Sequence, residues 1–321
     1  MGPVALGESV VSKTVSTSST PETTVNYIDR ESGNIFSYST ASRATTRTSN
    51  KTIPGIQSAS WLPNASLAFV RYLSGDNSST INTYALPLSG SGGFFLSQNL
   101  ADIAVSSTSV LILASGVNGS IGSLTNVDGS HATQIFTTPL SAIHASFAGK
   151  NQYLVYTKPS SLLLGNAYLV DSAGIFSRIF GPRMGLTALA SPSGKWVLVS
   201  YSLNGSMQMG LVNTTTNEVL SLPISTITDK CVWSADDSVI YCGVPLEFPF
   251  GSYPDDWYQG AVHFSDRIWK VQVSGRYAQL VLDFTKETNT LLDAESLVVD
   301  QLNSTLVFVN KNDLSLWSYS L

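Results

Sequence analysis

The chain has 321 residues, of which 43% are hydrophobic and 12% are charged, about half the charged share of an average soluble domain. The net charge of −5, from 17 Lys+Arg and 22 Asp+Glu, excludes the basic surface that nucleic-acid binding requires. The aromatic content of 10% argues against a disordered chain, and the sequence contains no run of about 18 apolar residues that would span a membrane.

The N-terminal residues predict one short β-strand followed by a connection. Pro3–Val11 has strand character, and the Ser/Thr-rich segment Ser12–Thr20 predicts a mobile link. Residues 1–19 lack the basic region and apolar run of a signal peptide. A chain from which an export signal or membrane anchor has been removed would look the same.

A template of an apolar strand, a polar turn and a second apolar strand recurs along the chain. Its five instances are Ser58–Val70, Ala145–Val155, Ala188–Val199, Val232–Tyr241 and Val298–Val309. Their spacing fits a repeat of about 43 residues, once doubled and once enlarged, and a third and a fourth strand follow in most units. Four antiparallel strands every 40 to 45 residues are typical of a β-propeller blade.

The repeat predicts an all-β chain that forms one β-propeller domain over residues 1–321. We expect seven four-stranded blades, and six would fit if the first unit is not a complete sheet. The predicted blades are about 1–52, 53–100, 101–140, 141–184, 185–227, 228–286 and 287–321. Because the last unit has only three strands, we expect Pro3–Val11 to complete it, so that the N- and C-terminal strands close the ring. Helical signals are nearly absent; Glu287–Glu295 has only a weak one.

Two of the turns resemble a known family of repeats. Ser191–Val199 has the sequence Ser-Pro-Ser-Gly-Lys-Trp-Val-Leu-Val, and Trp233–Tyr241 has Trp-Ser-Ala-Asp-Asp-Ser-Val-Ile-Tyr. Both resemble the TolB-type propeller repeat, in which a Trp/Phe-Ser-Pro-Asp-Gly-like turn joins the two inner strands of a blade. The resemblance covers about five units, and most turns lack the Asp. The block Tyr253–Tyr258 is similar to one in uncharacterised bacterial propeller proteins. The resemblance implies a propeller and brings no activity with it.

The two cysteines, Cys231 and Cys242, are too few for a four-ligand zinc site. If Asp236 and Asp237 form a two-residue hairpin turn, the cysteines lie directly opposite each other on paired strands. That position suits a cross-strand disulfide. Two reduced cysteines packed in the core are the alternative.

Sequence motifs for catalysis are missing. His131, His144 and His263 have no further ligand at metal-binding spacing, and His144 alternates with apolar residues in a predicted strand, which indicates a packed or channel-lining residue. No Gly-x-Ser-x-Gly elbow or phosphate-binding loop is present. We therefore expect no catalytic residues, no metal and no cofactor.

One segment stands out as a candidate site, the long insertion Pro245–Asp266 between the second and third strands of its blade. Aromatic rings beside carboxylates suit sugars or cationic groups, so we predict ligand contacts from this insertion. The predicted contact residues are Tyr253, Asp255, Asp256, Trp257 and Tyr258. In the alternative interpretation, the aromatic rings pack the loop onto its own blade.

The sequence favours a non-catalytic binding or scaffold propeller with a protein or glycan partner, acting outside the cytoplasm. The low Lys+Arg content, the high Ser and Thr content and the predicted Cys231–Cys242 bridge favour a periplasmic, cell-surface or secreted location. One alternative is a glycan hydrolase or lyase, in which Asp266, Asp255 or Glu247 would meet a carboxylate from another blade, such as Asp171 or Asp102. Another is a structural component of the cell surface.

Overall fold

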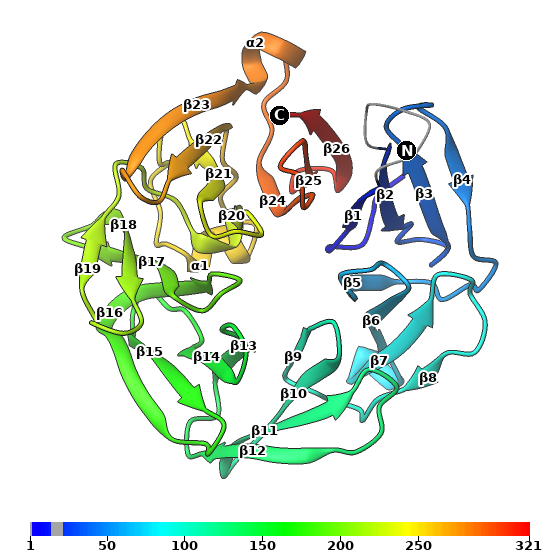
Figure 1. The fold of residues 1–321 in the computed structure, drawn as a ribbon, viewed down its shortest axis with the longest axis horizontal. Helices are drawn as coiled ribbons and strands as arrows, with labels where there is room; N and C mark the ends of the chain where they lie inside the picture. Colours follow the sequence, from blue (N-terminus) through cyan, green and yellow to red (C-terminus); the bar gives the residue numbers. More distant parts are fainter. Residues whose placement is uncertain (1, 14–21) are drawn as a thin grey trace.

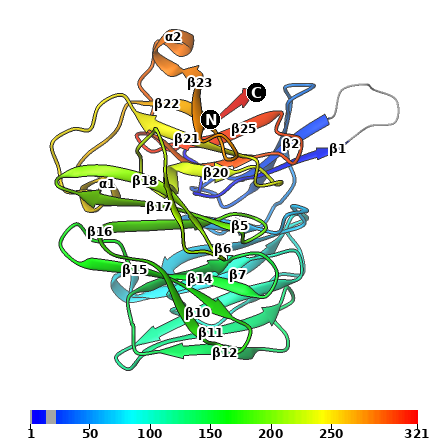
Figure 2. The same cartoon turned by 60° about the vertical axis from the view of Figure 1, so that its left-hand side comes forward.

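The computed structural model describes residues 2–13 and 22–321, and this part of the chain is nearly all β. Its strands form six sheets that are arranged as a ring (Figure 1). Helical structure is limited to two short α-helices, α1 (Asp255–Tyr258) and α2 (Phe284–Thr288), and two 3-10 turns, η1 (Asp76–Ser78) and η2 (Thr228–Lys230). The helix α2 protrudes from the ring (Figure 2). The predicted all-β propeller architecture is thus present.

The sheets follow one another along the chain. The first three contain β1 (Ser9–Lys13), β2 (Glu22–Ile28), β3 (Ile35–Ser39) and β4 (Thr45–Arg47); β5 (Ile56–Trp61), β6 (Leu67–Ser74), β7 (Thr80–Pro87) and β8 (Phe94–Phe95); and β9 (Asp102–Val105), β10 (Ser109–Gly116), β11 (Gly119–Asn126) and β12 (Thr133–Thr138). A seven-stranded sheet contains β13 (Ile143–Phe147), β14 (Gln152–Thr157), β15 (Leu164–Asp171), β16 (Phe176–Ala190), β17 (Trp196–Leu203), β18 (Ser206–Asn213) and β19 (Val219–Ser221). The last two contain β20 (Cys231–Trp233), β21 (Val239–Pro245), β22 (Asp266–Gln272) and β23 (Tyr277–Asp283); and β24 (Ala294–Val299), β25 (Thr305–Asn310) and β26 (Ser315–Ser320).

In each of the six sheets, strands that are consecutive in sequence are neighbours, and the first strand lies nearest the ring axis (Figure 1). The second strands are apolar because both faces of their sheet are covered by neighbouring sheets. In β6, for example, Ala68, Phe69 and Val70 are all fully buried. One apolar cluster joins Leu198 of β17 to Ile240 of β21, and such clusters between sheets form the core.

The seven-stranded sheet arises because β16 pairs with two neighbours. Its first part pairs with β15, up to the pair Leu164–Met184, and its second part pairs with β17. The register shifts between Met184 and Thr187, which is where the chain turns from one pairing to the other. The strand therefore runs from the outer edge of one four-stranded set to the inner edge of the next.

The predicted closure of the ring by strand pairing is wrong. β1 pairs with β2, with Ser9 opposite Asn26, and the last sheet has three strands. Ser12 and Lys13 belong to β1, whereas the rest of the predicted link, 14–20, lies outside the described residues. A strand that is followed closely by another forms a local antiparallel pair at a lower cost in chain entropy than a pair across the whole chain.

The first and last sheets meet by packing instead. Val4 and Tyr27 pack on Val309 of β25. The Val4 amide donates to the Leu314 carbonyl at 3.0 Å, and the Ser12 hydroxyl donates to Asp300 Oδ2 at 2.6 Å. The ring thus closes through side-chain contacts and a few hydrogen bonds.

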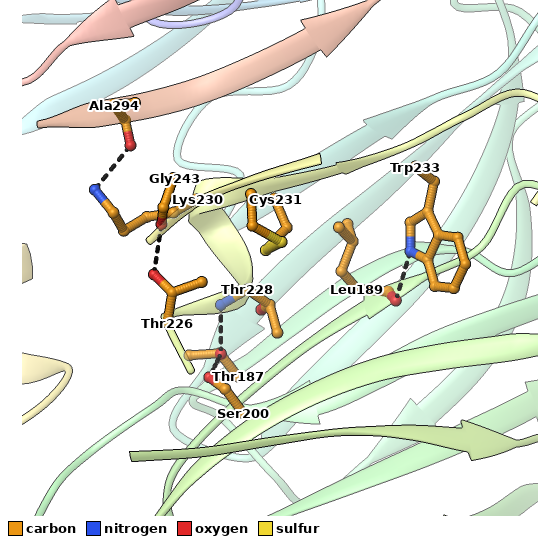
Figure 3. The surroundings of a disulfide bond; sticks show 11 residues. Thr187, Leu189, Ser200, Thr226, Thr228, Lys230, Cys231, Trp233, Gly243 and Ala294 are labelled. Carbon is orange, nitrogen blue, oxygen red and sulfur yellow. Dashed lines mark hydrogen bonds between the residues drawn. A yellow bond between two sulfur atoms is a disulfide. The ribbon is translucent and has the colours of Figure 1, made fainter. Parts of the chain in front are cut away.

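The hairpin β20–β21 has the predicted register, with Cys231 opposite Cys242. The two cysteines form a disulfide between the innermost strand and its neighbour (Figure 3). Lys230, directly before Cys231, points away from the disulfide toward the Ala294 carbonyl of the last sheet (Figure 3). The disulfide therefore joins the start of β20 to β21, and Lys230 joins it to β24 of the last sheet.

Candidate functional site

The predicted insertion is a loop of residues 246–265 between β21 and β22, the second and third strands of their sheet. It extends beyond its own sheet. The Ser161 amide, in the β14–β15 connection, donates to Asp255 Oδ2 at 2.5 Å, and Trp257 packs against Met207 of β18. The loop therefore leans over the seven-stranded sheet and contacts two of its parts.

Most aromatic rings of the loop pack against one another. Phe248, Tyr253 and Phe264 have ring centroids 5.5–5.6 Å apart. Trp257 and Phe264 are each only 2% exposed. The rings fill the inside of the loop. They also pack against Met207 of the seven-stranded sheet, whereas the alternative interpretation of the sequence placed them on the loop's own blade.

A cluster of buried charges lies beneath these rings. The Lys230 ammonium is fully buried, lies 2.8 Å from Asp266 Oδ2 and also forms an ion pair with Asp293. The Phe264 amide and Trp257 Nε1 donate to Asp293 Oδ2 at 2.9 and 3.0 Å. This buried cluster ties the loop to the start of the last sheet.

Two ammonium groups lie close to the Trp257 ring. Lys230 Nζ is 5.0 Å and Lys311 Nζ is 4.4 Å from its ring centroid, which is within the range of cation–π attraction. Burial raises the pKa of Asp266 to about 6, although Lys230 opposes the shift, and Asp293 adds to it. Trp257 and Asp266 thus act as parts of the protein interior.

A second, solvent-accessible cluster lies near the ring axis; we name it the axial cluster. Three of its members lie at or just before the start of an innermost strand, one lies near the end of the second strand of a sheet, and one lies in the long loop. They are Asp102 (β9), His144 (β13), Tyr156 (β14), Asp229 (η2) and Tyr258 (α1). In propellers built like this one, the connections between sheets and those between second and third strands lie on the same face as these strand starts.

Short contacts join the residues of the axial cluster in two groups, Asp102 with His144 and Tyr156, and Asp229 with Tyr258. His144 Nδ1 lies 3.1 Å from Asp102 Oδ2, and the His144 ring centroid is 5.2 Å from that of Tyr156. The Tyr258 hydroxyl donates to Asp229 Oδ2 at 2.5 Å. The His144 side chain is 40% exposed and Tyr258 is 40% exposed, so solutes can reach both.

The residues of the axial cluster alter one another's pKa values. Asp229 is exposed at the surface, but the protein packed around it raises the pKa of its carboxyl group, whereas the Tyr258 hydroxyl, His144 and Lys311 oppose this shift. Partial removal from water, followed by the charge of Asp229, raises the pKa of Tyr156 and of Tyr258 well above the usual value. The axial cluster therefore combines an acid of raised pKa, a histidine oriented by a carboxylate, and two neutral phenols.

The residues predicted from the insertion separate into two groups. Trp257 is buried, while Tyr253, Asp255 and Asp256 make contacts within or beside the loop; the Tyr253 hydroxyl, for instance, donates to the Pro249 carbonyl. Tyr258 alone of the five joins the axial cluster.

Sequence reasoning missed Asp229 and Tyr156 as site residues. Asp102, Asp229 and Asp293 all occur at or just before the start of an innermost strand. An acidic residue at equivalent positions of several repeats is a signal that could have identified Asp102 and Asp229 as site residues.

The carboxylates considered for hydrolysis are arranged differently from the prediction. Asp171 accepts hydrogen bonds from Ala173 and Ile175 in its own turn, and Glu247 is exposed. Asp102 lies near Asp229, an acid outside the long loop. Within residues 2–13 and 22–321, no group of three or more His, Cys, Asp or Glu is placed to hold a metal ion, and no helix is long and apolar enough to cross a membrane.

Comparisons with known proteins identify the fold. No protein-family model and no curated protein matches the sequence. Among solved structures, an oligogalacturonate lyase in complex with manganese matches with a TM-score of 0.63 at 10% identity, covering 100% of this chain and 98% of that chain. The β-propeller domain of the Trilobed protease from Pyrococcus furiosus, described as having an open velcro topology, has a TM-score of 0.60 at 10% identity, with 99% and 95% covered.

TolB from Acinetobacter baumannii has a TM-score of 0.50 at 11% identity, covering 98% of this chain and 79% of that chain. At these identities the likeness concerns the fold alone. The chain is a β-propeller similar in fold to TolB and to these other propeller proteins.

Proposed function

We propose that this chain is a non-catalytic propeller that binds a glycan at the axial cluster, outside the cytoplasm. The observation that supports this most is the Tyr258–Asp229 hydrogen bond, which brings the long loop to the strand starts where His144 and Asp102 also lie. Exposed aromatic rings beside carboxylates and an imidazole provide the stacking surface and directional hydrogen bonds that sugars require.

The proposal takes the ring as seven units. β16 is counted in two of them, divided near Met184 where its pairing changes from β15 to β17. The ligand would then contact units three, four and six, because Asp102, His144 and Asp229 come from these. A ligand at this site would therefore be held by side chains from three different units.

The extracytoplasmic setting is supported by the Cys231–Cys242 disulfide, because disulfides persist in oxidising compartments. The high Ser and Thr content and the scarcity of Lys and Arg agree with it. Two free thiols in protein purified from its native compartment under non-reducing conditions would contradict this setting.

We expect the Asp229→Asn variant to bind its glycan at least tenfold more weakly than the wild type, about 1.4 kcal/mol. The amide still accepts the Tyr258 hydrogen bond, so the fold is retained, but the anionic acceptor is lost. A glycan array would identify the ligand, and calorimetry with that ligand would give both affinities. Glu247→Gln, which removes an exposed carboxylate at the beginning of the long loop, is the matched control and should bind like the wild type. An array without hits, or equal binding by both variants, would contradict the proposal.

An enzyme acting on the same glycan is the second candidate. Asp102 orients His144 as it would orient a general base, and Asp229, whose pKa is raised, can donate a proton as a general acid. The match to an oligogalacturonate lyase makes acidic polysaccharides the first substrates to test. Cleavage of the bound glycan by the wild type and none by His144→Ala would favour the lyase or hydrolase; intact glycan after long incubation would favour the binding protein.

A further inference from the structure

A hollow of about 530 Å³ lies among the innermost elements of four sheets. β1 and β24 form its walls, and the β5–β6, β9–β10 and β24–β25 turns contribute Asn64, Ser107 and Gln301. These turns follow the first strands, so the hollow opens at the end of the ring opposite the axial cluster. Its size is in the usual range for small-molecule sites.

The lining is mostly uncharged. Val298, Val299, Trp61 and Leu62 supply apolar surface, and serines of β1 add hydroxyl groups. Glu8, directly before β1, is the exception among the lining residues. A ligand with an apolar body and one polar end fits such a surface.

Glu8 is a buried acid with an incomplete set of partners. It is 5% exposed, and because it lines the hollow, its remaining surface faces that space. Its Oε2 accepts a long hydrogen bond of 3.3 Å from the Ser296 hydroxyl, and no described side chain donates to Oε1, although the backbone amides of Gly7 and Glu8 lie near the carboxyl group. Because Oε1 is covered by protein, a donor in the hollow would reach the carboxyl group at Oε2, whose hydrogen bond to Ser296 is long.

The charges nearby indicate what kind of donor is missing. Glu295 of β24 lies near Glu8 and is paired with Lys311 at 3.3 Å. Lys230, the other ammonium group near Glu295, pairs with buried aspartates. Within the described part of the chain, no lysine or arginine pairs with Glu8. A cation at Glu8 would balance this acid, and a charged donor forms a stronger hydrogen bond to a carboxylate than a neutral one.

We propose that the hollow binds a primary ammonium group on a short aliphatic chain, with Glu8 as its counter-ion and the valines of β24 against the chain. The site is separate from the axial cluster and does not depend on the proposed glycan function. A free alkylamine and a lysine side chain of a polypeptide share this chemistry.

Binding involves one proton transfer. Burial raises the pKa of Glu8 to about 8, with the Ser296 hydroxyl and the backbone amide of Glu8 opposing it and Glu295 adding to it. Glu8 is therefore mostly protonated at pH 7 when the hollow is empty. On binding, the Glu8 O–H bond breaks, its proton goes to the buffer, and the ammonium N–H groups donate to the carboxylate that remains.

The probe is hexylamine, titrated by calorimetry at pH 7 in two buffers of different ionisation heat. We expect binding with release of close to one proton, and an affinity that rises about tenfold from pH 6 to pH 7. In Glu8→Gln the affinity should fall at least tenfold, and the proton release and pH dependence should disappear. Glu31→Gln, an exposed acid outside the hollow, should behave like the wild type.

Two further ligands separate the contribution of the charge from that of the chain. Hexanol has the same chain without the charge, and its binding as tightly as hexylamine would overturn the proposal, as would equal amine binding by wild type and Glu8→Gln. Nα-acetyl-lysine methylamide distinguishes the two sources: binding of both amines supports a polypeptide lysine, and binding of hexylamine alone supports a free amine. Circular dichroism verifies that Glu8→Gln is folded, and the isosteric amide makes folding the expected result.

Discussion

Replacing Lys230 by Met should lower the free energy of unfolding by about 3 to 5 kcal/mol at pH 8, as expected when one partner of a buried ion pair is removed. The substitution keeps the length of the side chain but leaves Asp266 and Asp293 buried without their shared cation. Urea denaturation followed by tryptophan fluorescence gives the value.

The loss of stability should depend on pH. Asp266 has a folded-state pKa of about 6, above its usual value of 3.8, so its carboxylate opposes folding more as the pH rises through this range. Without Lys230 this pKa rises further, because the attraction that lowers it is gone. The difference between wild type and Lys230→Met should therefore be smaller at pH 5 than at pH 8.

Lys286→Met is the matched control, since its side chain is 75% exposed and its ammonium lies 3.8 Å from Asp283. Exposed ion pairs contribute about 0 to 1 kcal/mol, so this variant should unfold like the wild type. Equal stabilities of Lys230→Met and Lys286→Met would show that the buried cluster does not stabilise the fold.

Replacing Trp257 by Ala should cost about 3 to 5 kcal/mol of stability, the range measured for large aromatic residues in protein cores. The side chain is 2% exposed, packs on Met207, Ile227 and Phe264, and donates to Asp293. Thermal unfolding measured by calorimetry gives the effect as a marked drop in Tm.

Tyr258→Phe is the control from the same helix. It removes one hydroxyl from a 40% exposed ring, so Tm should change little, whereas glycan binding at the axial cluster should weaken. A sharp loss of glycan binding in Trp257→Ala with unchanged Tm would contradict this division between a structural and a ligand-facing side chain.

Local pattern was sufficient to predict several features of the fold. The turn at Asp236–Asp237 determines that Cys231 faces Cys242, because a short hairpin fixes the register of its strands. The position of the long loop between second and third strands followed from counting strands within one repeat. The pairing of β1 could not be predicted in this way, because the same short strand can pair with either β2 or β26. The choice depends on which of these two strands the folded chain brings close to β1.

The candidate site could be predicted only in part. The composition of Tyr253–Tyr258 shows aromatic and acidic residues but not which of them face inward, and the burial of Trp257 depends on Met207 and Ile227 from other parts of the chain. Asp102 and His144 lie in different sheets and meet because the ring places neighbouring strand starts side by side. Such contacts leave no local pattern in a sequence.

The most direct test of glycan binding at the axial cluster is a crystal structure of the protein with the glycan selected on the array. We predict that the glycan lies at the axial cluster, with a hydroxyl within hydrogen-bond distance of Asp229 and a sugar ring against Tyr258 or Tyr156. A glycan on the outer rim, or one that touches the loop without reaching Asp229, would contradict this assignment.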